Sequence, residues 1–239
     1  MNSRRWRVAA AGVGLMLGIS VVPGSAASLA LSSQNLTPYR TCTITATPTT
    51  TTAVTDTSAQ QVAPTTNFGA LTTLTVSSGT GVNQRIYVRF DLTTCSPAIP
   101  ASATVRLATL RLFATALPAT CRTLDIFPST AAWVETTLTW NNQPFGTTLN
   151  NPPTGSRTGT FNVGTPAGCQ NLATSVYVVG GTVTADVVKF VAGTATNFGW
   201  MIRDDTENNF TTRTAIFSAK ELGTVAQEPQ LVIAYVTVP

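Results

Sequence analysis

The sequence predicts an all-β protein, an antiparallel β-sandwich of the jelly-roll type with one short helix. Three observations lead to this fold class. Apolar residues alternate with polar ones at a period of two in several segments, which is the pattern of a strand with one buried face. These segments are rich in Thr and Val, and Gly, Pro and Asn separate them. Helical spacing occurs in a single segment.

The alternating segments run through residues 53–239, which we interpret as one domain. In QRIYVRFDL, the apolar side chains of Ile86, Val88, Phe90 and Leu92 fall on one face of the strand. The same alternation is found in TLRLFA, TLDIF, GWMIR and PQLVIAYVTV. We therefore expect strands through most of this domain.

The segment with helical spacing covers residues 184–192 within TVTADVVKFVAGT. Val187, Val188 and Val191 are interpreted as one side of a helix, Thr184 is a suitable N-cap, and Gly193 is a suitable end. We expect a helix of two or three turns that crosses between strands.

Residues 1–27 read as an export signal. Three arginines precede an apolar run from Val8 to Val22, and small residues follow it. A twin-arginine signal is the alternative to general secretion, but Arg7 stands where that signal usually has a bulky apolar residue. We expect the mature protein to be secreted and extracellular.

The four cysteines all lie in the part that would be exported, where an even number favours disulfides. Three pairings are possible. We favour Cys42 with Cys95 and Cys121 with Cys169, because neighbours in chain order are often neighbours in space. Residues 28–52 are rich in Ser, Thr and Pro, which predicts a linker or a loosely attached arm that Cys42 would pin to the body.

The charge of the exported part is close to neutral. The leader holds three of the 14 Lys and Arg residues and none of the 10 Asp and Glu residues, which leaves a net charge of about +1. We therefore expect no nucleic-acid partner. No later stretch approaches the roughly 18 apolar residues of a membrane span, so we expect no membrane contact, and we expect a monomer.

Four stretches together carry a resemblance to a known module. They are RIYVRFDL followed by ATLRLFA, AAWVETTLTWNNQP, VTADVVKFVAGTATNFGWMIR, and IFSAKE before PQLVIAYV. In this order they resemble the DNRLRE-type domain, which is grouped with carbohydrate-binding module family 96. The resemblance runs from about Asp56 to about Tyr235 and implies a secreted β-sandwich with polysaccharide as its partner. It departs from the family at residues 182–184, which read Thr-Val-Thr instead of Asp-Val-Thr, and at Phe190, where tryptophan is common.

The sequence offers little for catalysis, because it has no histidine. This excludes the usual Ser-His and Cys-His pairs and removes the commonest general base. Glu135 is the one acid beside aromatic residues, and glycoside hydrolysis needs a second carboxyl about 5 to 10 Å away. A lyase that uses Tyr87 and Arg89, which share a strand face, is the remaining alternative. We expect no catalytic residues and a protein that is not an enzyme.

The candidate sugar contacts lie in and just after AAWVETTLTWNNQP. An indole ring packs against the apolar face of a sugar, and amides bond its hydroxyl groups. We interpret Trp133 and Trp200 as core residues, with Glu135 capping backbone amides of the turn. The candidate sugar-binding residues are Trp140, Asn141, Asn142 and Phe145.

No cofactor is required, but two acidic groups are candidate ligands of a structural calcium ion, which prefers oxygen donors. Asp204 and Asp205 lie in RDDTENN, which lacks the EF-hand spacing. Asp56 and Glu228 adjoin the first and last strands of the domain, which lie close together in a jelly roll. A solvated hairpin without an ion is the alternative.

These observations predict a secreted, non-catalytic domain that binds an extracellular or cell-wall polysaccharide. The alternative is a structural or adhesive cell-surface domain without sugar affinity.

Overall fold

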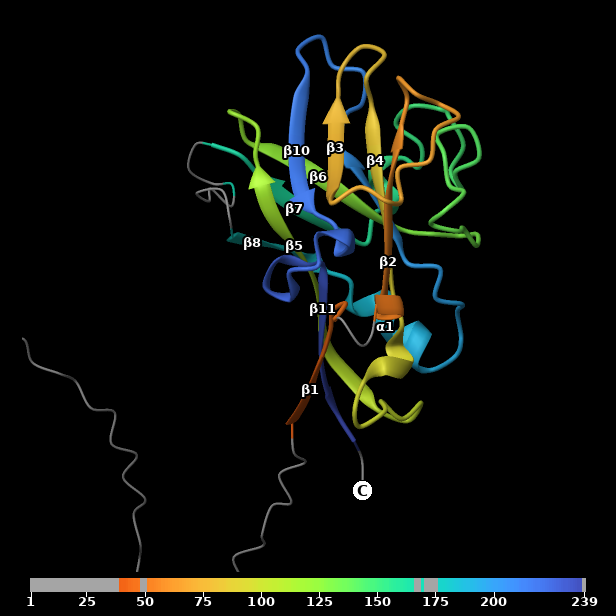
Figure 1. Cartoon of the computed structure of the whole chain (residues 1–239). Coiled ribbons are helices and arrows are strands. Elements are labelled where there is room, and N and C mark those ends of the chain that lie inside the picture. Colours follow the sequence, from red (N-terminus) through yellow and green to blue (C-terminus); the bar gives the residue numbers. More distant parts are fainter. Residues whose placement is uncertain (1–38, 48–50, 166–168, 170–175, 238–239) are drawn as a thin grey trace, which may run out of the picture. The chain divides into compact units, whose positions relative to one another are not determined.

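Every strand pairing in the described part of the chain is antiparallel, as the alternating segments predict. The structure, a computed structural model, describes residues 39–47, 51–165, 169 and 176–237. These residues form an 11-stranded sheet with one α-helix (Figure 1). Within these ranges no helix has the length and apolar character needed to cross a bilayer.

The described residues form eleven strands, one α-helix and five short 3-10 helices. The strands are β1 (Tyr39–Ile44), β2 (Val54–Gln60), β3 (Thr73–Ser78), β4 (Gln84–Phe90), β5 (Thr104–Ala116), β6 (Arg122–Pro128), β7 (Gly159–Val163), β8 (Val176–Thr182), β9 (Trp200–Asp204), β10 (Arg213–Ser218) and β11 (Gln230–Val236). The helices are α1 (Thr184–Val191), η1 (Thr51–Ala53), η2 (Leu92–Thr94), η3 (Thr154–Ser156), η4 (Lys220–Leu222) and η5 (Val225–Gln227). The hydrogen-bonded order is β1-β11-β5-β10-β3-β4-β9-β6-β7, with β2 paired to β4 and β8 paired to β5.

The sheet curls so that strands from its two halves pack on one hydrophobic core. Strands β5 and β11 contribute from one half, and β4, β6 and β9 from the other. Core residues from these strands include Leu110, Ile233, Ile86, Ile126 and Ile202. Burial of each such side chain contributes roughly 1.5–3 kcal/mol. Two β layers around a shared core make a sandwich, so the predicted fold class is confirmed.

The outer face of β4 is also buried, although the alternation predicts one buried face. Tyr87 on β4, Phe127 on β6 and Met201 on β9 form a second apolar cluster on this outer face. Trp133 and Trp140 complete the cluster from the connection between β6 and β7. Residues 129–150 of this connection, which continues to residue 158, are called the covering segment below. It turns a solvent-facing side of the sheet into a second, smaller core.

Helix α1 ends within one residue of the predicted boundary. Val187 is buried, but Val188, predicted on the same side, is 43% exposed, because the next residue in a helix points about 100° away. Gly193 follows the helix with a φ of 69°. The predicted cap differs, because Val183 is the N-cap residue and Thr184 is the first helical residue. The Thr184 hydroxyl instead accepts a hydrogen bond from the backbone N–H of Ala108 in β5, at 2.9 Å. It therefore anchors the helix to the sheet.

Strand β1 lies within the region that the sequence predicts to be a linker or loosely attached arm. Its six residues pair with β11, with Tyr39 opposite Val236 and Ile44 opposite Leu231. Cys42 and Ile44 point into the core, while their neighbours are exposed. The alternation in this short stretch is hard to recognise in the sequence, because Ser, Thr and Pro residues surround it. Pairing with β11, the last strand, makes β1 part of the sheet.

Both disulfides form with the predicted pairing. The Cα atoms of Cys42 and Cys95 are 5.7 Å apart, and those of Cys121 and Cys169 are 5.6 Å apart, which suits a disulfide. We expect no free thiol when the purified protein is denatured without reductant, and a peptide map with these two cross-links. Titration of any free thiol, or a cross-link between Cys42 and Cys121, would contradict the pairing.

Candidate functional site

Trp140 is packed beneath its neighbours. The side chain is 3% exposed, and the Arg85 guanidinium carbon lies 4.8 Å from the centre of the indole ring. A cation over an indole face is attractive and also occupies that face. A stacking platform for a sugar needs an exposed ring face, and the structure does not present Trp140 in this way. Trp133 and Trp200 are buried as predicted.

The asparagines next to Trp140 shape the turn. Asn142 Oδ1 accepts from the backbone N–H of Thr139 at 2.7 Å, and Asn142 Nδ2 donates to the carbonyl of Thr137 at 2.9 Å. Asn141 is exposed, and Phe145 is half-buried against the second cluster. A sugar contact at Asn141 and Asn142 stays a prediction, now without an aromatic platform beside it.

A buried polar network connects β4 to the covering segment. The Arg85 Nε donates to Glu207 Oε1 at 2.7 Å, and Nη2 donates to Glu207 Oε2 at 2.8 Å. Arg85 also donates to the carbonyls of Gly146 and Thr148. Sequence reasoning missed this pair, because its partners are 122 residues apart and share no local pattern.

Tyr87 lies inside the same network. Its hydroxyl donates to Gln143 Oε1 at 3.0 Å, and burial raises the pKa of the tyrosine well above its ordinary value. Arg89, two residues later, is half-buried. The Tyr87 hydroxyl is therefore held away from solvent, which argues against Tyr87 and Arg89 as an acid–base pair.

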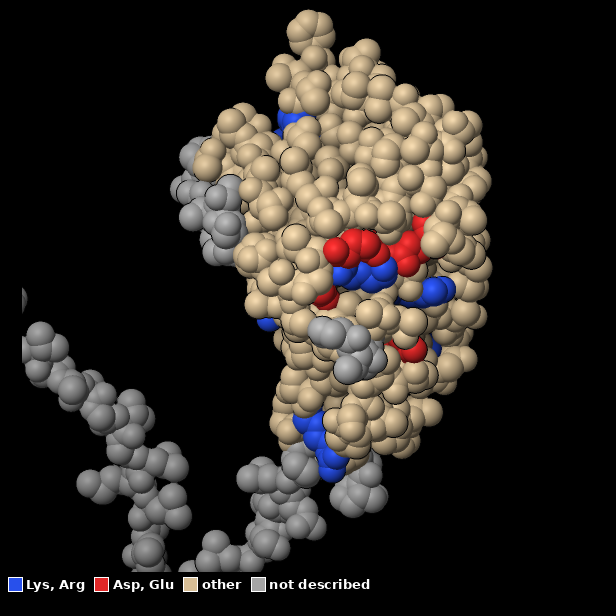
Figure 2. Space-filling model, viewed as in Figure 1, with Lys and Arg blue, Asp and Glu red and all other residues tan. Residues whose placement is uncertain are grey.

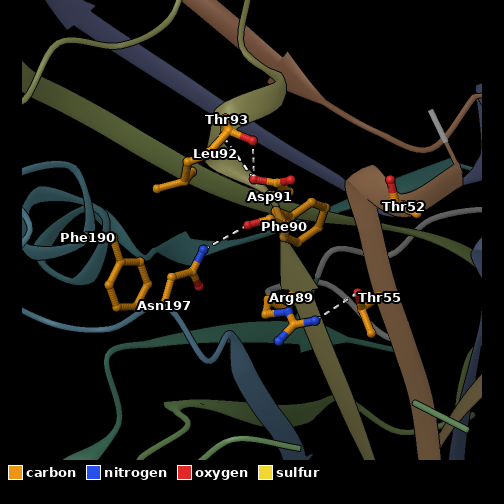
Figure 3. Close-up of a pocket in the computed structure, with 9 residues that line it drawn as sticks. All are labelled: Thr52, Thr55, Arg89, Phe90, Asp91, Leu92, Thr93, Phe190 and Asn197. Atoms are coloured by element: carbon orange, nitrogen blue, oxygen red, sulfur yellow. Dashed lines mark hydrogen bonds between the residues drawn. The ribbon is translucent and has the colours of Figure 1, made fainter. Parts of the chain in front are cut away.

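An open groove of 420 Å³ lies where β4 ends. It is bordered by β2, η2, α1 and the loop that follows α1 (Figure 3). Its lining residues are Thr52, Thr55, Arg89, Phe90, Asp91, Leu92, Thr93, Phe190 and Asn197. In the view of Figure 3, Phe190 and Thr55 stand at opposite sides, with Asn197 and Arg89 between them. Sequence reasoning missed the groove, because its residues come from five separate places in the chain.

The groove combines one partly exposed aromatic ring, Phe190, with several polar groups, because the second lining phenylalanine, Phe90, is fully buried. Phe190 packs on Trp200 with a ring-centre distance of 5.6 Å and remains half-buried. Arg89 Nη2 donates to Thr55 Oγ1 at 3.4 Å, and the guanidinium carbon lies 5.7 Å from the centre of the Trp133 ring. Asp91 Oδ1 accepts from the N–H and the hydroxyl of Thr93. Such a lining offers both donors and acceptors to a polar ligand.

The predicted calcium ligands Asp204 and Asp205 lie among arginines. Asp204 Oδ1 is 3.0 Å from Arg122 Nη2 and 2.9 Å from Arg213 Nη2. Asp205 also pairs with Arg122. Two arginines balance these two carboxylates, so this group has no excess negative charge for a cation.

The predicted ligand Asp56 lies in a different electrostatic setting. It is fully buried, its Oδ2 accepts from the backbone N–H of Lys220 at 3.0 Å, and its own N–H donates to Glu135 Oε1 at 3.2 Å. Burial raises the pKa of Asp56 well above its usual range, and Glu221 acts in the same direction. Glu228 lines a cavity of 330 Å³ together with Lys220 and Glu221. Figure 2 shows acidic and basic groups gathered in one small area of this face, beside β2.

Comparison with known proteins gives one result that covers most of the chain. The profile of carbohydrate-binding module family 96 matches residues 47–235, which cover strands β2 to β10 and all but the last residue of β11. The comparison with curated proteins gives no match. Together with the antiparallel sandwich described above, the match shows that the chain belongs to carbohydrate-binding module family 96.

Proposed function

We propose that the protein is a secreted, non-catalytic module that binds an extracellular or cell-wall polysaccharide through the groove at the end of β4. The observation that carries this proposal is the family match over residues 47–235. The export signal in residues 1–27 supports an extracellular partner. The absence of histidine from the sequence supports a binding role rather than catalysis.

The groove suits a sugar in both size and chemistry. Ligand sites are commonly about 300–1,000 Å³, and the groove volume of 420 Å³ falls in this range. A sugar unit presents an apolar ring face and a rim of hydroxyl groups. Phe190, at the position where related modules commonly have tryptophan, would contact the ring face. Arg89 and Asp91 would donate to and accept from the hydroxyls.

The Trp140 turn is the competing place for the sugar. Asn141 and Asn142 are exposed there, but the indole is covered by Arg85. The groove has a half-buried aromatic ring that no cation covers among the described residues, and a half-buried arginine with one printed side-chain hydrogen bond, so we favour it.

Affinity electrophoresis against a panel of polysaccharides tests both whether the protein binds a polysaccharide and whether the groove is the binding site. We expect retardation by at least one polymer, and a 10- to 100-fold weaker affinity for Arg89→Ala, because a hydrogen bond from a charged donor contributes about 1.5–3 kcal/mol. Asn141→Ala is the matched control, a polar exposed residue outside the groove, and should bind like the unaltered protein.

The outcomes separate the alternatives. Weakening by Asn141→Ala but not by Arg89→Ala would move the site to the Trp140 turn. Failure of every polymer to retard the protein would contradict polysaccharide binding and favour a structural or adhesive domain. Circular dichroism of each variant checks that the fold is intact.

A further inference from the structure

Three carboxylates from distant parts of the chain meet beside η4. Asp56 belongs to β2, Glu135 to the covering segment, and Glu221 to η4. One carboxylate oxygen from each residue lies within 4.8 Å of the other two. Like charges at this distance repel, so the arrangement favours a bound cation or a proton.

Several oxygens at this place lack a protein partner. Asp56 is fully buried, and its Oδ1 has no hydrogen-bond partner among the described residues. The same holds for Glu221 Oε2 and for Glu228 Oε2, the latter on a side chain that is 2% exposed. Buried polar atoms in proteins are nearly always bonded, so each exception calls for an explanation. An ion held by the three-carboxylate group would supply the missing partner of Asp56 and Glu221, while Glu228 lines the adjoining cavity.

The cation present at the cluster does not balance its charge. Lys220 Nζ lies 2.8 Å from Glu135 Oε1 and also pairs with Glu221. One ammonium against three carboxylates leaves two negative charges when all three are ionised, and the nearby Glu228 adds to this field. The excess equals the charge of one divalent cation. The Asp204 and Asp205 group, in contrast, is neutralised by two arginines.

The donor set favours a hard cation. Every side-chain ligand at the cluster is a carboxylate oxygen, and hard divalent cations such as calcium prefer oxygen. Calcium takes six to eight oxygens and accepts water among them. The adjoining cavity of 330 Å³, lined by Thr51, Glu221 and Glu228 among others, provides room for such waters.

We propose that Asp56, Glu135 and Glu221 bind a calcium ion, and that Lys220 is the resident counter-ion that calcium displaces. The lysine stem is flexible and its side chain is 16% exposed, so the ammonium can move to solvent when the ion enters. The ion then joins β2, the covering segment and η4 at one point. Calcium binding thereby stabilises the position of the covering segment on the sheet.

Isothermal titration calorimetry and thermal unfolding test the site on the purified protein after treatment with a chelator. We expect about one calcium ion per chain. At a hundredfold excess over the Kd, the Tm should rise by about 5–10 °C, and excess chelator should reverse the rise. Magnesium at the same concentration should give a smaller shift, because it demands a tighter octahedral geometry.

Two variants distinguish an ion site from a merely structural ion-pair cluster. Glu221→Gln removes one ligand from a partly exposed position and should weaken calcium binding at least about tenfold. Lys220→Gln removes the competitor and should strengthen binding, while lowering the Tm without calcium and restoring it with calcium. Asp205→Asn, in the other acidic group, is the control and should bind calcium unchanged.

The proposal is overturned if the unaltered protein and Lys220→Gln both show no heat and no Tm shift with 10 mM calcium, a concentration about tenfold above the weakest Kd usual for extracellular calcium modules. It is also overturned if Asp205→Asn loses binding and Glu221→Gln keeps it. Neither result depends on whether a polysaccharide is bound.

Discussion

Replacement of Glu207 by glutamine should lower the free energy of unfolding by about 3–5 kcal/mol, because it leaves the Arg85 guanidinium buried without its counter-charge. Both side chains of this pair are 0% exposed. The glutamate uses both oxygens toward Arg85, and Oε2 also accepts from the backbone N–H of Asn150 at 2.6 Å. Glutamine has nearly the same shape as glutamate, but its side-chain NH2 group replaces one carboxylate oxygen and would face the N–H donors of Arg85 and Asn150.

Urea unfolding followed by tryptophan fluorescence measures this loss as a lower midpoint with an unchanged slope. The control is Asp205→Asn, because the Arg122–Asp205 pair has side chains that are 18% and 29% exposed. Such a pair contributes about 0–1 kcal/mol. Equal losses in the two variants would mean that burial does not set the strength of the Arg85 pair. The double variant Arg85→Met and Glu207→Leu should recover part of the lost stability, because it leaves no buried charge without a partner. The recovery should be incomplete, because the carbonyls of Gly146 and Thr148 lose their donor.

Substitution of Gly199 by alanine should cost about 3 kcal/mol of folding free energy. The residue has a φ of 73°, where a side chain is strained, and an added Cβ would lie 2.2 Å from the Val88 carbonyl oxygen and 2.7 Å from the Arg89 Cα. Both neighbours are backbone atoms of β4, which cannot turn aside as a side chain can. The strand pairing of Val88 with Trp200 would have to open instead.

Gly193→Ala provides the matched comparison. Its φ of 69° is similar, but a Cβ there meets no atom within 4 Å. The loss should therefore be about 1–2 kcal/mol, from backbone strain alone. Thermal unfolding of both variants gives the difference, and an equal loss would show that the close approach of Gly199 to β4 carries no cost. Because Arg89 adjoins this contact, Gly199→Ala should also weaken polysaccharide binding if the groove is the site.

The strands could be predicted because their signal is local. Strand β11 alternates buried and half-buried residues along its whole length, as its sequence indicates. Strand β4 differs from this pattern. Its alternation predicts that the polar groups of Arg85 and Tyr87 face solvent, but both side chains are buried. Their burial depends on partners far along the chain, Glu207 and Gln143, and on a covering segment without regular secondary structure. No short pattern reports such partners.

The same distinction applies to the candidate sites. The sequence pointed to Asp56 as a candidate ligand, but paired it with Glu228 because both adjoin terminal strands. The structure adds Glu135 and Glu221, which come from loops whose path a strand pattern does not describe. Trp140 had the residue type and neighbours of a sugar platform, yet the nearby Arg85 covers its ring. Residue type predicts chemistry, whereas exposure depends on the tertiary fold.

The pairing of β1 with β11 determines how the module responds to mechanical tension. The two strands are antiparallel, and Tyr39 and Val236 lie opposite each other at one end of the pair (Figure 1). A force that pulls Tyr39 and Val236 apart therefore loads the hydrogen bonds between β1 and β11 one after another, and not all at once as in shear. Separation would proceed from Tyr39 to Cys42, where the bond to Cys95 ties β1 to the residue that follows η2. Under tension, the module would therefore release the few residues before Cys42 at low force and then resist further extension.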